Sequence, residues 1–242
     1  MSQVPTKQHQ DQPVLSRSPT PRERARTETL VQIKTIALRQ LADGGVGAIS
    51  LKAIALEIGL TGPAIYRYVA SRNELLTELI IDAYDDLAAA LDSVARARTA
   101  DPWQVQVNAL ADAYRAWAVE QPHRYRLLFS APLPGYDANA QRLVEAADMS
   151  MAVFLNVYTR TGVGADGGPP LGKTLTKQLR AWAVTRSRDP RTPEALYQGV
   201  ITWTRVHGFV SLEIEGAFAS MGIDPDAVFH REVDALTAHQ SR

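Results

Sequence analysis

Residues 50–76 read SLKAIALEIGLTGPAIYRYVASRNELL, and this stretch contains two short helical segments separated by a tight turn. Ser50 stands directly before the first segment, where a side-chain oxygen caps the start of a helix. Gly59 closes that segment, as glycine commonly does at a helix end. Thr61 offers a second cap, and Pro63 falls in the first turn of the next segment, where a missing N–H does no harm. The stretch therefore predicts a helix-turn-helix.

Apolar residues on both segments provide the faces that would lock the two helices together. They recur at helical spacing: Leu51, Ile54, Ala55, Ile58, Leu60, Ile65 and Val69. Ala55 is small at a point where the two helices must approach closely. Ser71 is followed three residues later by Glu74, a spacing that predicts a capping box at the start of a further helix.

The second segment carries side chains that suit contact with DNA. Its first residues are small, so the backbone can lie against a groove, and free N–H groups at a helix start favour an anion. The early residues of the second helix face base edges in helix-turn-helix proteins, which makes Arg67 the candidate for reading a guanine. Arg72 begins the next helix and is placed for phosphate. The candidate DNA-binding residues are Ser50, Thr61, Gly62, Pro63, Ala64, Tyr66, Arg67, Tyr68 and Arg72.

The rest of the chain reads as helix after helix, with proline and glycine between the segments. Before residue 50, apolar residues from Leu30 to Leu41 recur at helical spacing, and Gly44 and Gly45 end that helix. Residues 162–172 form the clearest flexible loop. No period-2 alternation persists long enough to argue for a sheet, so the predicted fold class is all-α. The helical patterns cover residues 72–98, 102–121, 122–129, 139–161, 171–186, 193–221 and 225–239.

Composition limits the class of protein. The 242 residues are 45% hydrophobic and 21% charged, as in soluble globular chains. No run approaches the ~18 apolar residues of a membrane helix, and the start offers no secretory signal, so we expect a cytoplasmic protein without membrane contact. There are no cysteines, which excludes disulfides, Cys-ligated zinc and thiol catalysis. Residues 1–80 hold ten Lys and Arg against seven Asp and Glu, a mildly basic balance that suits contact with phosphate.

The quoted stretch resembles the DNA-binding domain of the tetracycline-repressor (TetR) family over about residues 25–80. The matching elements are Ser50, Ile54-Ala55, Ile58-Gly59-Leu60-Thr61, Tyr66, Arg67-Tyr68 and residues 71–76. Val69 stands where the family usually has Phe, and Arg72 stands where it usually has Lys, which keeps the charge. The resemblance implies that Tyr66 and Arg72 hold the DNA backbone while residues 61–67 read bases.

A second resemblance lies near the end of the chain, in Trp203, His207 and Gly208. This run is similar to the C-terminal domain of a TetR subfamily known by its Trp-His-Gly (WHG) signature. The resemblance implies that helices 193–221 and 225–239 pair with their counterparts in a second subunit, with Gly199, Gly208 and Gly216 permitting close contact. It implies a homodimeric repressor that binds a palindromic operator in double-stranded DNA and is released by a small-molecule effector.

We therefore expect a disordered tail at 1–21, a three-helix DNA-binding domain at 22–70, and a helical ligand-binding and dimerisation domain at 71–242. The tail is rich in Gln, Ser, Pro and Thr and cannot bury enough surface to order itself. Its basic residues suit contact with DNA, although a plain solvated tail explains them better.

The rear domain has aromatic residues from which a pocket can be built, since small-molecule sites are mostly apolar and often lie between helices. The candidate ligand-binding residues are Tyr114, Trp117, Phe129, Phe154, Trp182 and His207. A buried, hydrogen-bonded His207 is the alternative to a ligand contact. Arg115 and Arg205 are candidates for an anionic ligand, although a salt bridge explains each as well.

Two other functions compete with the regulator. One is a helical interaction module whose helix-turn-helix no longer reads DNA. The other is a hydrolase that uses His207, Ser211 and Glu215, which share one helix face. Neighbours on one rigid helix rarely form catalytic geometry, and nothing suggests an oxyanion hole. The sequence therefore predicts no catalytic residue, cofactor or metal ligand.

Overall fold

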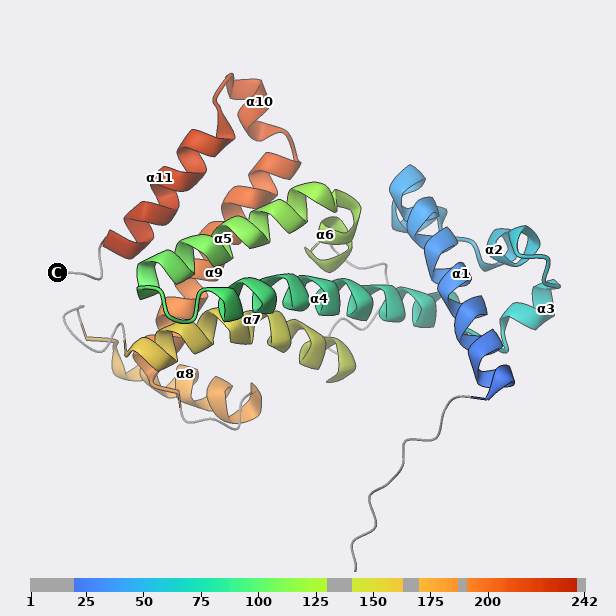
Figure 1. Ribbon diagram of the computed structural model, residues 1–242, viewed down its shortest axis with the longest axis horizontal. Coiled ribbons are helices and arrows are strands. Elements are labelled where there is room, and N and C mark those ends of the chain that lie inside the picture. Colours follow the sequence, from blue (N-terminus) through green and yellow to red (C-terminus); the bar gives the residue numbers. More distant parts are fainter. Residues whose placement is uncertain (1–19, 130–140, 163–169, 187–190, 239–242) are drawn as a thin grey trace, which may run out of the picture.

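The computed structural model describes residues 20–129, 141–162, 170–186 and 191–238, and within these ranges every element is helical (Figure 1). The all-α prediction is confirmed. Of the expected tail at 1–21, Thr20 and Pro21 instead form the start of the first helix, and residues 1–19 lie outside the described residues. So do residues 163–169 of the expected loop, the first residues of the pattern at 139–161 and the last residue of the pattern at 225–239.

The front of the chain forms α1 (Pro21–Gly44), the short 3₁₀ helix η1 (Val46–Ala48), α2 (Leu51–Glu57) and α3 (Gly62–Ile65). Thr20 and Glu23 make a capping box that starts α1, a signal that the sequence analysis missed. Gly45 ends α1 with φ +68°, in the left-handed region that glycine tolerates. These four elements group at one end of the molecule (Figure 1).

A long helix, α4 (Arg72–Ala97), leads from this group into the rear. Ser71 accepts a hydrogen bond from the Glu74 N–H at 3.1 Å, which is half of the predicted capping box. The reciprocal half is absent from the described hydrogen bonds, because the Glu74 carboxylate pairs with Arg142 at 3.3 Å instead.

The rear consists of α5 (Trp103–Glu120), α6 (Pro122–Phe129), α7 (Gln141–Thr161), α8 (Lys173–Arg186), α9 (Pro193–Ile214), α10 (Ala217–Met221) and α11 (Pro225–Ala238) (Figure 1). Of these, α5, α6 and α7 pack on α4. Helices α5 and α7 flank α4, α9 packs on both of them, and α8 and α11 pack on α9.

The prediction of one helix over 193–221 is wrong. Helix α9 ends at Ile214, and Gly216 adopts φ +79°, a left-handed conformation that a right-handed helix does not continue through. The chain then turns into the separate helix α10. This break redirects the chain toward α11, which lies over α5 and α9.

Two hydrophobic clusters form the main cores. The front cluster joins α1, α2, α3 and the first turns of α4, so it continues past residue 70 to Leu79. The rear cluster takes Leu87 and Leu91 from farther along α4 and adds residues of α5, α6, α7, α9 and α11. Leu127 of α6 belongs to the front cluster although α6 is otherwise a rear helix. Helices α4 and α6 therefore connect the two cores.

Candidate nucleic-acid interface and ligand cavity

The helix-turn-helix is held by buried apolar contacts and local caps. The Ser50 Oγ accepts from the Ala53 N–H at 3.3 Å and starts α2, as predicted, while the Ser50 N–H donates to Gln40 Oε1 at 2.9 Å. Ile54 and Ile65 are almost fully buried. At the turn, the Leu60 N–H donates to the Ala55 carbonyl at 2.8 Å. Ser50 thus has a structural role in fixing the first helix.

The start of α3 presents an exposed surface. Thr61, Gly62 and Pro63 are all exposed, and Ala64 is half-buried. The predicted cap by the Thr61 hydroxyl is wrong, because the Ala64 N–H donates to the Thr61 carbonyl at 2.9 Å. The hydroxyl is left for contact outside the protein.

Tyr66 and Arg67 are exposed after α3, with Tyr66 57% exposed, so its ring is not used for packing. The Arg67 carbonyl accepts from Arg26 Nη1 at 2.8 Å. The Arg26 guanidinium also lies 5.4 Å from the centre of the Tyr68 ring, which is half-buried against the front cluster. Arg26 of α1 therefore fixes this end of the reading surface, and Tyr68 contributes mainly to packing.

Arg72 makes contacts that the sequence did not predict. Its Nε donates to the Ile49 carbonyl at 2.9 Å, and its Nη2 donates to the Val46 carbonyl. These bonds tie the start of α4 to the connection between α1 and α2. An arginine has five N–H donors, so others stay available for phosphate. Arg72 is thus a positioning residue as well as a candidate DNA contact.

The rear contains a cavity of about 170 Å³ whose lining side chains come from α4, α5, α6, α7, α8 and α9. Of the predicted ligand-binding residues, Tyr114, Phe129 and Trp182 line it. The helical pattern does not say which side of a helix faces a cavity, so the other lining residues could not be predicted from it. These residues are Tyr84, Leu87, Ala147, Asp148, Ser150, Met151, Arg186 and Trp203.

Trp117 and Phe154 lie elsewhere in the rear core. The Trp117 Nε1–H donates to Asp86 Oδ2 at 2.9 Å, and the Phe154 ring is buried to 1% exposure among core residues. Neither lines the cavity, so their predicted ligand contacts find no support.

His207 lies behind the cavity wall rather than in its lining. Its ring stacks on Trp203 with centroids 5.1 Å apart and lies 4.5 Å from that of Phe129. The hydroxyls of Tyr125 and Tyr114 lie 3.0 and 3.2 Å from its Nδ1. Burial lowers the pKa of His207 and raises the pKa of Tyr125 to about 12. His207 is therefore half-buried and hydrogen-bonded, which fits the alternative in its hydrogen bonds and only in part in its burial.

The imagined hydrolase triad is not assembled. His207 Nδ1 is occupied by the tyrosine hydroxyls, and no described hydrogen bond joins it to Ser211. Glu215 pairs with Arg126 at 2.9 Å instead. Ionic partners likewise explain the two arginines considered for an anionic ligand. Arg115 contacts Glu213 at 2.6 Å, and Arg205 contacts Glu232 at 3.3 Å.

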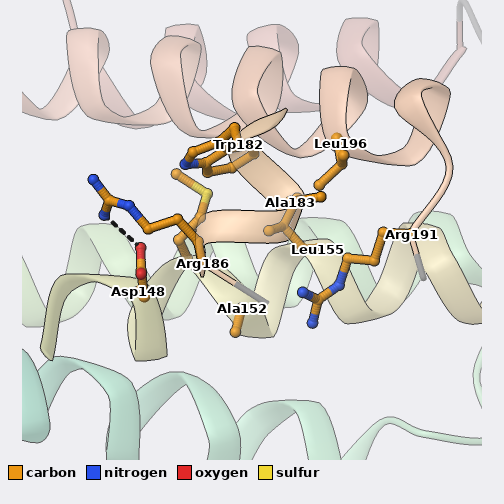
Figure 2. Close-up of a pocket in the computed structure, with 9 residues that line it drawn as sticks. Asp148, Ala152, Leu155, Trp182, Ala183, Arg186, Arg191 and Leu196 are labelled. Atoms are coloured by element: carbon orange, nitrogen blue, oxygen red, sulfur yellow. Dashed lines mark hydrogen bonds and ion pairs between the residues drawn. The ribbon is translucent and has the colours of Figure 1, made fainter. Parts of the chain in front are cut away.

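An ion pair between α7 and α8 borders the cavity. Asp148 Oδ1 and Arg186 Nη1 lie 2.8 Å apart, beside the Trp182 ring (Figure 2). The same three side chains and Met151 also line a neighbouring void of about 30 Å³ that extends toward Leu196 of α9. The pair fixes the position of α8 at the edge of the cavity.

Comparison with known proteins identifies the family. Residues 35–79 match the family model of bacterial regulatory proteins of the tetR family, and residues 107–236 match that of the tetracyclin repressor-like C-terminal domain. The chain belongs to the TetR family. It is 36% identical over 219 residues to the HTH-type transcriptional regulator Rv1816 of Mycobacterium tuberculosis, a match that covers 88% of this chain and 93% of that one.

Comparison with solved structures supports the same family assignment. The crystal structure of the regulatory protein SCO4313 is 38% identical, with a TM-score of 0.74, over 90% of this chain and 98% of that one. A Rhodococcus sp. RHA1 protein of unknown function shares the fold at 22% identity, with a TM-score of 0.68, over 88% of this chain and 96% of that one. This TetR-family chain is a DNA-binding transcriptional regulator, a non-enzymatic class of protein. No helix in the described ranges is both long enough and apolar enough to cross a membrane.

Proposed function

We propose that this TetR-family regulator is a homodimeric repressor that binds a palindromic operator. A small molecule bound in the rear cavity would weaken that binding and so relieve repression. The observation that carries the proposal is the pairing of an exposed reading surface on a packed helix-turn-helix with an aromatic cavity in the rear. Two helices, α4 and α6, run between them.

The proposed DNA surface is centred on the exposed Thr61, Tyr66 and Arg67. The Arg67 guanidinium has no partner among the described residues and is therefore the proposed base reader. Tyr66 and the unused donors of Arg72 are proposed to hold phosphates. The small Gly62, with open space at its Cβ position, lets the backbone approach the groove.

The proposed dimer surface runs along α9, as the Trp-His-Gly resemblance implies. Residues at helical spacing on one face are exposed or half-buried: Tyr197, Ile201, Thr204, Gly208 and Leu212. Gly208 meets no atom within 4 Å of its Cβ position, so a second helix has room to approach there. Gly199 serves internal packing instead, because a Cβ there would clash with the Leu155 side chain.

Relief of repression is proposed to pass through α6. Phe129 of this helix lines the cavity, and Leu127, two residues earlier, is buried in the front cluster. Arg126 ties the same helix to Glu215 and the Ile214 carbonyl at the end of α9. A ligand that displaces Phe129 would therefore shift a side chain packed under the reading head. Since coupling between sites is reciprocal, DNA would weaken ligand binding by the same factor.

A gel-shift assay with DNA upstream of the protein's own gene tests the proposal. We expect salt-sensitive binding to a palindrome whose half-sites lie about one helical turn, roughly 34–36 Å, apart. Sedimentation should give a dimer, and Leu212→Arg on the exposed face of α9 should give a monomer with weaker operator binding. A monomeric wild type, or binding that ignores the palindrome, would refute the proposal.

A further inference from the structure

The cavity in the rear defines a chemical class of ligand. We propose that it takes a small, uncharged molecule with one aromatic ring and an oxygen that accepts a hydrogen bond. The inference rests on the proposed function, since it treats this cavity as the effector site.

The size of the cavity sets the first limit. Its volume is about 170 Å³. A buried apolar cavity of ~150 Å³ holds a benzene molecule. One six-membered ring with a short substituent therefore fits within this volume, and a fused polycyclic compound would extend beyond it.

The lining selects for an aromatic ring. Of the eleven described lining residues, five are aromatic, and each comes from a different helix: Tyr84, Tyr114, Phe129, Trp182 and Trp203. Tyr84 and Phe129 already meet edge to face, with centroids 6.3 Å apart. Aromatic rings prefer edge-to-face or offset contacts with each other, so rings on several sides favour a planar ring between them.

The charges around the cavity cancel. Among the described lining residues, Asp148 and Arg186 are the ionised side chains, and they pair with each other at 2.8 Å. Burial raises the pKa of Tyr114 well above its ordinary value and lowers that of His207, so both stay neutral near pH 7. The pair is neutral overall, so a charged ligand meets no uncompensated opposite charge there, whereas a neutral ligand needs none.

The Tyr84 hydroxyl is an unused hydrogen-bond donor among the described lining residues. The Tyr84 hydroxyl has no hydrogen-bond partner among the described residues, whereas Ser150 Oγ already donates to the Ala147 carbonyl at 2.9 Å. Burial raises the pKa of Tyr84, so its hydroxyl keeps its proton and donates. An oxygen on the ligand is the complement of this donor.

Binding of five probes to the full-length chain tests the proposal. Phenol and benzaldehyde meet every criterion, cyclohexanol lacks the aromatic ring, and benzoate and benzylamine carry a charge. Binding is measured by calorimetry and by quenching of tryptophan fluorescence, since two tryptophans line the cavity. We expect phenol and benzaldehyde to bind at least ten-fold more tightly than the other three. Equal or tighter binding of cyclohexanol or a charged probe, or no binding of any probe, would overturn the proposal.

Three variants locate the site. Tyr84→Phe should weaken benzaldehyde binding roughly five-fold, because it removes one neutral hydrogen bond. Ala147→Leu should fill the cavity and abolish binding, while Met149→Ala, on the exposed side of the same helix, should leave it unchanged. Unchanged binding by both Tyr84→Phe and Ala147→Leu would place the probes elsewhere and refute the assignment.

A ligand-free gel shift separates this inference from the proposed function. Specific operator binding without probe binding would refute the ligand class alone. Probe binding without operator binding would refute the repressor proposal and leave the ligand class standing.

Discussion

The helix-turn-helix and the rear cavity are both built where helices converge, but one region is filled and the other is hollow. In the front cluster, Ile54, Ala55 and Ile65 are buried to 1% exposure or less. In the rear, aromatic side chains from five helices surround a space of about 170 Å³. A DNA-binding surface must hold its geometry against DNA, whereas the effector site proposed for the cavity must admit a ligand. Close packing serves the first need and a cavity serves the second.

Adding the same side-chain volume to each region should give opposite results. Ala55→Leu forces three more carbons into a filled core and should cost about 1–3 kcal/mol of the free energy of unfolding. Ala147→Leu places the same atoms beside the cavity and should change that free energy by less than about 0.5 kcal/mol. Urea denaturation followed by circular dichroism measures both. Equal losses would mean that the two regions do not differ in packing.

The front was predictable because its signals are local. The caps at Ser50 and Ser71 and the glycine at the first turn lie within 27 consecutive residues, so the chain near each residue fixes its conformation. Arg72 is the exception within this stretch. Its carbonyl partners lie 23 and 26 residues earlier in the chain, and no local pattern reports them.

The rear was less predictable because its site depends on which way each helix faces. Trp117 and Trp182 look alike in the sequence. In the structure, Trp117 lies in the core and donates a hydrogen bond to Asp86, whereas Trp182 lines the cavity. Gly199, Gly208 and Gly216 also look alike in the sequence, and of these three only Gly216 takes a positive φ and breaks the helix. Tertiary packing decides these differences, so the helices could be predicted and the cavity lining only in part.

Two arginines at the DNA-facing end should separate reading from positioning. Arg67→Ala should leave stability unchanged and cost about 1–3 kcal/mol of discrimination at one base pair. Arg72→Ala should weaken binding to all sequences, and it should also destabilise the fold by about 1–3 kcal/mol because two backbone carbonyls lose a charged donor. Gel shifts on operator and mismatched DNA, together with urea denaturation, test both variants. A stable Arg72→Ala protein would show that those bonds do not hold the reading head.

Two glycines in the rear should respond oppositely to alanine. Gly216→Ala places a Cβ at φ +79° and should destabilise the fold by about 1 kcal/mol. Gly208→Ala lies within α9 with open space around it and should stabilise the isolated subunit by up to about 1 kcal/mol. If Gly208 lies in the dimer interface as proposed, Gly208→Ala should also weaken self-association. Thermal unfolding and sedimentation equilibrium measure the two effects, and tighter association of Gly208→Ala would contradict the placement of the interface.

The smallest effect should be the dependence of stability on pH through His207 beside the cavity. Burial lowers the pKa of His207 in the folded chain below its ordinary value of about 6.5, so the unfolded chain binds the proton more readily. The contribution is therefore fully present above about pH 6.5 and is lost as the pH falls toward the lowered pKa.

His207→Gln should remove this part of the pH dependence, whereas His123→Gln at an exposed position should retain it. The test compares the midpoint of thermal unfolding at pH 7.5 and pH 5.5 in the three proteins. An equal drop in wild type and His207→Gln would mean that another group carries the dependence. A ligand in the cavity should enlarge the drop in the wild-type unfolding midpoint between pH 7.5 and pH 5.5. The bound ligand would cover the cavity-lining side chains next to His207, so protonation of His207 would become still less favourable.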